Sequence, residues 1–492
     1  MGTPIPGPFL GSGLLTDLYQ LTMACAYWKE GIHEREAAFH MSFRTPPFHG
    51  GFTIACGLAE AVAYLQALRF DDSDLAYLAT LSGAQGKRLF DPAFLEYLRV
   101  LRFACDVDAV PEGTVVFPHE PLLRVQGPIL QAQLIETALL NFINFQTLIA
   151  TKAARICLAA RGEPVVEFGF RRAQGVDGGM TASRAAYVGG CAGTSNVLAG
   201  KIFGIPVRGT HAHSWVLAFN NELEAFQAYA RAMPANTTFL VDTYNSLEGV
   251  RHAIEVGKAL RRHGHELAGI RLDSGDLAFL SIQARKILDE AGFTQTSIVG
   301  SNDLDEYIIE SLKQQNAKIN VWGVGTRLVT AYDHPALGGV YKLSAIRGTD
   351  GQWQHKIKLS EQAAKITNPG ILQVRRFRSN GEFVGDAIYD LELPLPATFT
   401  IVDPLDTTRR KDFAANIPSE DLLVSIFRKG ELVYALPALS ELRERARRQL
   451  EGFHAGIKRT INPHQYPAGV ELGLHQLKAR LILRARGGGS DK

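Results

Sequence analysis

Short apolar runs alternate with amphipathic stretches between residues 163 and 344. Helical patterns over Leu247–Arg262, Leu277–Glu290 and Leu304–Gln315 separate several of these runs. Strands that alternate with helices at intervals of roughly 25–35 residues form βαβ units with parallel pairing. The pattern predicts an α/β domain, for which an irregular barrel, closed or nearly closed, is favoured over an open two-winged sheet. The predicted strands are Pro164–Phe168, Pro206–Gly209, Thr238–Val241, Gly269–Leu272, Ser297–Val299, Ile319–Trp322 and Gly339–Leu343.

The segments on either side of this domain have a different pattern. Helical and strand-like stretches mix before it and end in a long apolar helix or helix pair over Leu130–Ala160. After it, β-like runs precede an amphipathic helix over Leu439–Glu451. We therefore expect an α+β domain at 1–150, the barrel with the active site at 151–365, and a smaller C-terminal region at 366–492 that packs on the first domain. Residues 487–492 are typical of a flexible tail.

The composition is that of a globular protein with two or three domains. The 492 residues are 46% hydrophobic and 21% charged, and 52 basic against 50 acidic residues leave a formal net charge of +2. A balance this even argues against nucleic acid or an anionic membrane as the main partner. Any anionic ligand must therefore be held by locally placed groups.

Cysteine usage and the absence of long apolar runs favour a cytoplasmic protein. The five cysteines are dispersed, with no C-x-x-C spacing, which indicates free thiols in place of disulfides or a zinc site. No apolar run reaches the ~18–20 residues that span a bilayer. The stretch Met1–Ser12 lacks the basic and apolar regions of a secretory signal.

Polar side chains follow most of the predicted barrel strands. The βα loops of a barrel converge at the carboxyl ends of its strands, and barrel enzymes assemble their active sites there. One polar strand end is uninformative, whereas a series of them indicates a functional site. The series comprises Arg171 and Arg172, His211 and His213, Asp242, Asp273 with Ser274 and Gly275, Ser301 and Asn302, and Gly323–Thr326 with Arg327.

The residue types in this series suit a phosphorylated sugar. Backbone N–H groups approach phosphate closely in glycine-flanked turns such as Gly323–Thr326. Arg171 and Arg327 offer bidentate donors for phosphate or carboxylate, and Asp242 and Asp273 suit sugar hydroxyls or a magnesium diphosphate. Each feature alone also has a structural interpretation as a tight turn, a solvated pair or a helix cap.

His211 and His213 lie two residues apart on an extended segment and therefore share one face. A zinc hydrolase would need further histidines at later strand ends, and the sequence offers only Asp242 and Asp273 there. A non-catalytic binding barrel would need no histidine beside the phosphate elements. The remaining hypothesis makes one imidazole a nucleophile that accepts a phosphoryl group. The pattern alone does not choose between the two histidines.

The motifs at these strand ends resemble those of nicotinate phosphoribosyltransferases, within the type II phosphoribosyltransferase group. The resemblance runs from about Leu14 to Leu343 and is less diagnostic beyond it. The matching blocks are Thr16–Met23, Glu167–Arg172, Gly193–Asn196, Gly209–Trp215, Val241–Tyr244, Ile270–Asp276, Gly300–Asp303 and Gly323–Thr326.

The resemblance implies a reaction and its cofactors. Nicotinate and 5-phosphoribosyl 1-diphosphate would give nicotinate mononucleotide and diphosphate, with ATP as co-substrate and Mg²⁺ stabilising the leaving diphosphate. This is the first step of NAD biosynthesis from nicotinate. The family match makes His213, with Ser214 after it, the phosphorylated residue.

The resemblance also assigns roles to other residues. Phe168 and the Tyr19 of a partner subunit would sandwich the pyridine ring, so a homodimer with shared sites is expected. Asp242 and Asp273 would be catalytic and would contact the metal only through the magnesium diphosphate. The remaining expected substrate contacts are Arg171, Ser195, Thr210, His211, Arg271, Ser274, Gly275, Asn302, Gly323, Gly325, Thr326 and Arg327.

Ser195 bears on substrate choice. Relatives that use nicotinamide carry an aspartate at the matching position, which suits an amide N–H and repels the carboxylate of nicotinate. A serine donates to that carboxylate, so nicotinate is favoured. The quinolinate enzyme is a more distant relative, and the matches at Tyr19 and His213 speak against it. Near the C-terminus, Arg375, Arg376 and Arg378 are open to contact with ATP or a partner, and a surface position is favoured.

Overall fold

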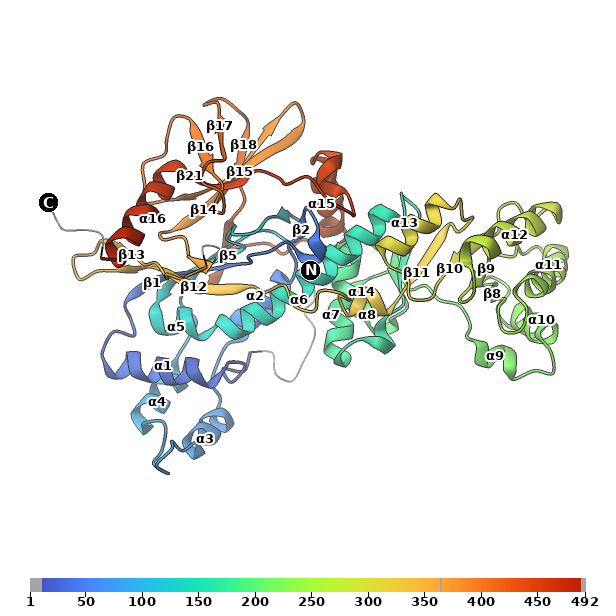
Figure 1. Ribbon diagram of the computed structural model, residues 1–492. Helices are drawn as coiled ribbons and strands as arrows, with labels where there is room; N and C mark the ends of the chain where they lie inside the picture. Colours follow the sequence, from blue (N-terminus) through green and yellow to red (C-terminus); the bar gives the residue numbers. More distant parts are fainter. Residues whose placement is uncertain (1–10, 363–364, 488–492) are drawn as a thin grey trace. The chain divides into compact units, whose positions relative to one another are not determined.

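The computed structural model describes residues 11–362 and 365–487. The chain forms two compact units. Unit 1 combines the chain up to Thr151 with the chain from Ala336, and unit 2 is the continuous segment Lys152–Pro335 (Figure 1). Unit 2 is thus inserted between two segments that fold together. The terminal residues 1–10 and, except for Gly487, the predicted tail at 487–492 lie outside the described residues.

Unit 1 contains a seven-stranded antiparallel sheet in the order β13-β12-β1-β5-β3-β19-β20. Its interior strand β1 reads Glu-Ala-Ala-Phe-His-Met-Ser and is buried along most of its length. The strands are β1 (Glu36–Ser42), β3 (Asp106–Ala109), β5 (Leu123–Pro128), β12 (Val340–Arg347), β13 (Trp353–His355), β19 (Val424–Arg428) and β20 (Glu431–Leu432).

The position of β12 corrects one prediction. The run Gly339–Leu343 was expected to be a barrel strand, but β12 pairs with β1 in unit 1, Met41 lying opposite Tyr341. Residues 336–365 accordingly belong to unit 1 and not to the barrel segment. An apolar run predicts a strand but carries no information about which sheet the strand joins.

A second sheet of unit 1 comes from the C-terminal segment, in the order β17-β16-β21-β15-β14-β18. Phe377, Phe399 and Phe413 form its core, with the rings of Phe377 and Phe413 stacked 4.0 Å apart. The strands are β14 (Leu372–Ser379), β15 (Glu382–Asp390), β16 (Phe399–Val402), β17 (Arg410–Phe413), β18 (Ser419–Asp421) and β21 (Ala468–Glu471), and β2 (Thr53–Ile54) and β4 (Val115–Val116) form a separate pair.

The helices of unit 1 cover these sheets, and the apolar faces of four of them share one core that includes Leu21, Leu78, Phe94 and Leu130. The predicted helix pair over Leu130–Ala160 is present as α5 and α6, and α15 has the predicted bounds. The helices are α1 (Leu18–Lys29), α2 (Leu58–Ala67), α3 (Asp72–Thr80), α4 (Pro92–Val100), α5 (Ile129–Leu134), α6 (Glu136–Ala159, which continues into unit 2), α15 (Leu439–Glu451) and α16 (Leu472–Ala485), with 3-10 turns η1 (Pro47–His49) and η4 (Ala455–Lys458).

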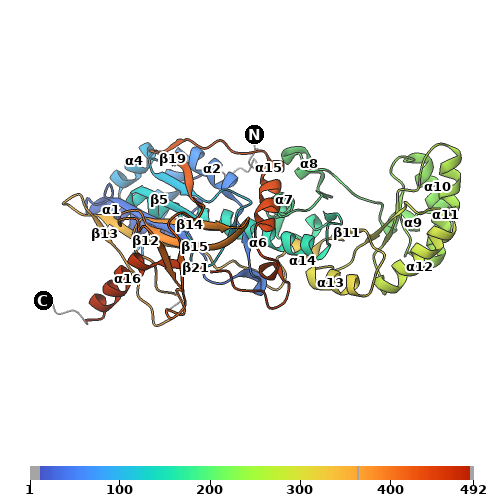
Figure 2. The same ribbon diagram turned by 90° about the horizontal axis from the view of Figure 1, so that it is seen from above.

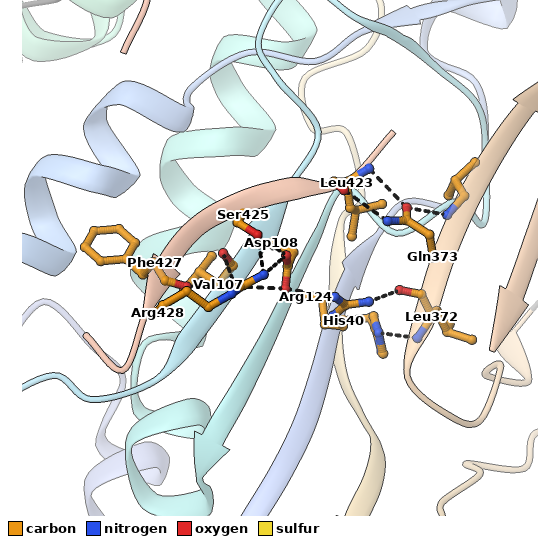
Figure 3. Close-up of polar contacts among 11 residues, drawn as sticks. His40, Val107, Asp108, Arg124, Leu372, Gln373, Leu423, Ser425, Phe427 and Arg428 are labelled. Atoms are coloured by element: carbon orange, nitrogen blue, oxygen red, sulfur yellow. Dashed lines mark hydrogen bonds and ion pairs between the residues drawn. The ribbon is translucent and has the colours of Figure 1, made fainter. Parts of the chain in front are cut away.

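Hydrogen bonds and ion pairs of the buried Asp108, Arg124 and His40 tie the C-terminal segment to the N-terminal sheet (Figure 3). Asp108 accepts hydrogen bonds from Arg124 at 2.8 Å and from Arg428 at 2.6 Å. Arg124 also donates to the carbonyl of Leu372 at 2.8 Å, and the backbone N–H of Leu372 donates to His40 at 3.1 Å. A buried charge is tolerated only when it is paired in this way, so these contacts fix the register between the two segments.

Arg376 departs from the expected surface position. Its side chain is fully buried and makes a bidentate ion pair with Asp386, with hydrogen bonds of 2.9 and 2.5 Å. Arg375 pairs with Asp421 at 2.8 Å, and Arg378 is exposed. Sequence pattern did not reveal the burial of Arg376 because its partner is supplied by the neighbouring strand.

Unit 2 is built on a six-stranded parallel sheet in the order β7-β6-β11-β10-β9-β8. The strands are β6 (Val165–Glu167), β7 (Gly193–Thr194), β8 (Thr238–Leu240), β9 (Gly269–Leu272), β10 (Ser297–Gly300) and β11 (Val321–Val324). The helices are α7 (Gly175–Val188), α8 (Val197–Phe203), α9 (His213–Leu217), α10 (Glu222–Ala232), α11 (Ser246–Arg262), α12 (Leu277–Glu290), α13 (Glu306–Gln314) and α14 (Thr326–Val329), with the 3-10 turn η2 (Phe170–Arg172).

The irregular α/β barrel is present as a half-barrel. The Pro206–Gly209 segment contributes a single parallel bridge, in which Val207 pairs with Thr194, the last residue of β7. Within the described residues, no strand pairing joins β8 back to this segment. Helices α10, α11 and α12 lie together on one side of β8 and β9 (Figure 2). Parallel pairing places the carboxyl ends of all the strands at one edge of the sheet.

No helix among the described residues is both long and apolar enough to cross a membrane.

Candidate active site

A cavity of about 310 Å³ lies at the carboxyl ends of the strands of unit 2. It brings together many of the predicted site residues, although they come from separate strand ends. Phe170, Gly209, Ala212 and Leu240 also line it. The predicted residues in its wall are Phe168, Arg171, Ser195, Thr210, His211, His213, Arg271 and Asp273.

His213 begins α9 and is 41% exposed, whereas its partner Asp242, just beyond β8, is 1% exposed. The Nε2 atom of His213 lies 3.1 Å from Oδ1 of Asp242. The other oxygen of Asp242 accepts hydrogen bonds from the backbone N–H of Asp273 at 2.9 Å and from the Ser274 hydroxyl at 2.6 Å. Because an ionised carboxylate only accepts, it holds the proton of His213 on Nε2 and leaves the Nδ1 lone pair available.

His211 has a different environment. Its Nε2 accepts the backbone N–H of Leu240 at 3.3 Å, and its Nδ1 lies 3.3 Å from the carbonyl of Ala212. The ring packs against Phe226, Tyr229 and Phe239. Burial lowers the pKa of His211 below its ordinary value. Both ring nitrogens of His211 are engaged, whereas the His213 imidazole is partly exposed at the cavity wall.

Arg271 connects three strand ends. Its guanidinium donates to Ser301 at 2.8 Å, to Thr210 at 3.0 Å and to Asp273 at 2.8 Å. Ser301 also donates a short hydrogen bond to Asp273. Burial alone would raise the pKa of Asp273, but the Ser301 hydrogen bond and the Arg271 charge outweigh it and hold that pKa below its ordinary value. The Asp273 carboxylate is therefore ionised at neutral pH.

The aromatic wall of the cavity depends on a glycine. The guanidinium of Arg271 lies 5.4 Å from the centre of the Phe168 ring, within cation–π range. A Cβ atom at Gly323 would lie 2.6 Å from that ring. Gly323 therefore makes room for Phe168, and the phosphate contact expected of its backbone stays a prediction.

Arg171, Ser195 and Phe170 line the same cavity. Arg171 is exposed in η2, and Ser195 follows β7. A guanidinium and a hydroxyl are donors that suit a ligand carboxylate. The donor pair fits the predicted recognition of nicotinate at this end of the cavity.

Several predicted contacts do not line this cavity. Arg327 pairs with Asp305 at 2.5 Å and stacks over Tyr332. Asp305 in turn caps the N-terminus of α13 through the backbone N–H of Ile308. The roles expected of the others stay predictions. They are Tyr19, which is in unit 1 and 48% exposed, and Ser274, Gly275, Asn302, Gly323, Gly325 and Thr326.

The carboxylates fit an indirect contact with a metal better than direct ligation. Both oxygens of Asp242 and one of Asp273 already accept hydrogen bonds. Among the residues that the structure describes, no cluster of three His, Cys, Asp or Glu side chains is placed to hold a metal. Mg²⁺ is bound to proteins commonly through one or two carboxylates together with substrate phosphates. The magnesium ion expected from the sequence, as part of a magnesium diphosphate, stays a prediction.

The sequence did not identify Glu167, the last residue of β6, as a residue that supports the site. Its side chain is fully buried and accepts hydrogen bonds from Ser183 and Thr194. The only signal in the sequence is an acidic residue that directly follows the apolar pair Val165–Val166.

Family models match three stretches of the chain. Residues 14–144 match the nicotinate phosphoribosyltransferase (NAPRTase) N-terminal domain, and residues 164–368 match the NAPRTase family. Residues 373–478 match the NAPRTase C-terminal domain, which extends the likeness beyond the motifs recognised in the sequence.

Relatives that are similar over nearly their full length carry the same family name. The nicotinate phosphoribosyltransferase of Bacillus subtilis (strain 168) is 45% identical over 481 residues, covering 95% of this chain and 96% of the relative. That of Homo sapiens is 36% identical over 511 residues, covering 92% and 93%. The crystal structure of human nicotinic acid phosphoribosyltransferase matches with a TM-score of 0.82 at 34% identity, covering 95% of this chain and 99% of that one. The chain belongs to the nicotinate phosphoribosyltransferase family.

Proposed function

We propose that this chain converts nicotinate and 5-phosphoribosyl 1-diphosphate into nicotinate mononucleotide and diphosphate, coupled to ATP hydrolysis through phosphorylation of His213. Family membership supports the transfer reaction. The observation that supports the coupling is the exposed His213 imidazole, which Asp242 orients at the wall of the cavity. This activity would serve NAD biosynthesis by salvage of nicotinate.

The transfer step needs a flat aromatic surface and a cationic environment. The pyridine nitrogen attacks C1 of the ribose while the bond from C1 to the diphosphate oxygen breaks. Phe168 offers the stacking surface, and Arg171 and Ser195 donate to the nicotinate carboxylate. Asp273, ionised and held by Arg271, accepts from ribose hydroxyls and stabilises positive charge developing on the sugar. Magnesium would arrive on the diphosphate and neutralise its charge.

The coupling step uses the Nδ1 lone pair of His213. Nδ1 attacks the γ-phosphorus of ATP, the bond to the β-γ bridging oxygen breaks, and ADP leaves. The resulting phosphohistidine is hydrolysed by water to phosphate and free His213. Asp242 stabilises the imidazolium character that develops on the ring during attack.

The proposed assembly is a homodimer. Tyr19 on α1 is 48% exposed, a position that leaves it accessible to a partner subunit. Tyr19→Ala should lose the ring that stacks on the base, and His213→Ala should lose ATP-coupled transfer. A mixture of the two variants should recover ATP-coupled transfer if the site is shared. Mixtures with no more ATP-coupled transfer than the separate variants, or an active monomer by light scattering, would contradict sharing.

A cytoplasmic location is proposed with small-molecule substrates only. None of the five cysteines forms a disulfide, as suits a reducing compartment.

The proposed function is tested with purified protein, nicotinate, 5-phosphoribosyl 1-diphosphate, Mg²⁺ and ATP. Nicotinate mononucleotide and ADP should form together, with nicotinate preferred over nicotinamide. Absence of the mononucleotide refutes the function. Its formation with no ATP turnover refutes the coupling alone.

A further inference from the structure

One buried carboxylate sits between the two strand ends that carry the base-binding residues. Glu167 ends β6, and its side chain is inaccessible to solvent. One of its oxygens accepts a short hydrogen bond from the backbone N–H of Gly169. Gly169 is the residue between Phe168 and Phe170, both of which line the cavity. The carboxylate therefore constrains the turn that leads to Arg171.

The second oxygen of Glu167 holds the neighbouring strand end. It accepts the hydroxyl of Thr194 at 2.6 Å and that of Ser183, on α7, at 2.9 Å. Thr194 directly precedes Ser195, whose backbone N–H donates to the carbonyl of Glu167 at 2.9 Å. Side chain and main chain of a single residue thus fix Ser195 beside β6.

The hydroxyls around Glu167 are oriented by a further residue. Thr194 Oγ1 accepts the backbone N–H of Asn196 at 2.9 Å, and the Asn196 amide donates to Ser183 at 3.2 Å. Thr194 and Ser183 accept from Asn196 and donate to Glu167, and Ser183 also lies within hydrogen-bond distance of the Gly179 carbonyl, at 3.0 Å. A network in which each buried group is satisfied rigidifies the elements that it joins.

We propose that Glu167 is the positioning residue of the nicotinate subsite: it sets the separation between Arg171 and Ser195 and thereby the affinity for the carboxylate of the base. The inference rests on the proposed function for the identity of the base. Glu167 does not line the cavity and acts through its neighbours. Positioning matters because carboxylate recognition by two donors is lost with small displacements.

Glu167→Gln is the sharpest substitution because it keeps the shape of the side chain. The amide presents one donor where the carboxylate accepts on both sides. The backbone N–H of Gly169 can only donate, so the new NH₂ must face Thr194 and Ser183. Both hydroxyls already accept from Asn196. The Ser183 proton can turn to the carbonyl of Gly179 at 3.0 Å, whereas the Thr194 proton loses the carboxylate acceptor that it has at 2.6 Å. The β7 end is then expected to move.

The experiment compares Glu167→Gln with a matched control, Glu163→Gln. Glu163 lies at the opposite end of β6, where it accepts from Trp322 Nε1 at 2.7 Å and pairs with Lys313. We expect Glu167→Gln to raise the KM for nicotinate about tenfold, the scale of one lost hydrogen bond to a charged group. The KM for 5-phosphoribosyl 1-diphosphate and ATP hydrolysis without nicotinate should stay within about twofold, as should all parameters of Glu163→Gln.

A second pair of variants tests the same hydrogen bond independently, in case Glu167→Gln misfolds. Thr194→Val removes the hydroxyl that donates to Glu167 and should also raise the KM for nicotinate. Thr194→Ser keeps that hydroxyl and should restore the wild-type value. An unchanged KM for nicotinate in Glu167→Gln and Thr194→Val overturns the inference, and so does an equal loss of nicotinate-independent ATP hydrolysis.

Direct nicotinate binding, measured by calorimetry, separates this inference from the proposed function. If the wild type binds nicotinate but forms no mononucleotide, the proposed function is refuted and the inference is not. The inference is then supported if Glu167→Gln binds nicotinate about tenfold more weakly than the wild type. Equal binding by the two proteins overturns the inference. Wild type that does not bind nicotinate overturns both.

Discussion

Nε2 of His213 lies 3.1 Å from Oδ1 of Asp242, and the second oxygen of Asp242 is itself held by Asp273 and Ser274. Asp242 therefore cannot rotate freely, and the imidazole is presented in one orientation. The pair joins the proposed nucleophile, His213, to the strand end that carries Asp273, the carboxylate proposed to bind ribose. Loss of this link should affect ATP hydrolysis more than transfer.

Replacement of His213 by alanine should abolish ATP hydrolysis and the stimulation of transfer by ATP. Some ATP-independent formation of nicotinate mononucleotide should remain, because the cavity and its aromatic wall are intact. Both rates are measured on one preparation by release of ADP and of mononucleotide. Wild-type ATP hydrolysis in His213→Ala would move the nucleophilic role to His211.

Replacement of Asp242 by asparagine should move the proton of the neutral His213 ring from Nε2 to Nδ1. Asp273 N–H and the Ser274 hydroxyl need an acceptor, so the asparagine oxygen faces them and its NH₂ faces His213. The ring must then accept at Nε2 and carry its proton on Nδ1, which removes the nucleophilic lone pair. We expect ATP hydrolysis to fall roughly a hundredfold or more.

Trapping of acid-labile phosphoprotein with γ-labelled ATP measures this effect directly. The control is Asp276→Asn, since Asp276 caps α12 and asparagine caps helices equally well. Phosphoprotein formed at the wild-type rate in Asp242→Asn would exclude the tautomer argument.

Replacement of Ser195 by aspartate should shift preference from nicotinate toward nicotinamide. The new carboxylate in the cavity wall would repel the carboxylate of nicotinate and accept the amide N–H of nicotinamide. The ratio of kcat/KM for the two bases is the measurement. A ratio equal to that of wild type would remove Ser195 from substrate selection.

Replacement of Gly323 by alanine should displace Phe168. The added Cβ would lie 2.6 Å from the ring, closer than side chains pack, and overpacking of this kind costs about 1–3 kcal/mol. We expect a raised KM for nicotinate and a lower midpoint of unfolding. Gly178→Ala is the matched control, because no atom lies within 4 Å of its added Cβ. Equal behaviour of the two variants would contradict the packing role.

Acid should destabilise unit 1 through His119. Burial and the nearby charges of Lys478 and Arg44 lower the pKa of His119 from its ordinary 6.5 to about 4. The unfolded chain therefore takes up this proton first as pH falls. The contribution of neutral His119 to the free energy of unfolding is complete above pH 6.5 and is lost between pH 6.5 and about 4. The full loss corresponds to about 3 kcal/mol.

Urea unfolding at pH 7 and pH 5 tests whether the free energy of unfolding falls with pH because of His119. His119→Asn should lose less stability than wild type over this interval, and asparagine tolerates the positive φ of 69° at this position. The exposed His263→Asn variant is measured in parallel. A loss in His119→Asn as large as in wild type would exclude His119 as the source.

The sequence allowed the parallel α/β sheet and its site edge to be predicted because each strand end is marked locally, but not that the barrel stays half open. A β-branched run followed by Asp242 or Asp273 needs no distant information to be recognised. The Gly339–Leu343 run was placed in the wrong unit because its partner, β1, lies some three hundred residues earlier. The choice of His213 over His211 required either a family resemblance or the hydrogen bond from Leu240 to His211.

Contacts between distant residues account for the remaining differences. The role of Glu167 depends on Ser183 and Thr194, which approach it only after α7 has packed. Arg327 has the residue type of a phosphate ligand, but its ion pair with Asp305 depends on how α13 and α14 are placed. Periodicity predicts elements, whereas such pairings follow from tertiary structure.

The insertion of unit 2 imposes an order on folding during synthesis. Strand β5 ends at residue 128 and β12, which pairs with β1, begins at residue 340, a difference of 212 residues. At ~5–20 residues per second, the early strands wait about 10–40 s for β12 and longer for β19. Unit 2 is continuous and has all its strands within that interval. On the ribosome, nascent β1 therefore has an open edge, at which a chaperone or another nascent chain competes with β12.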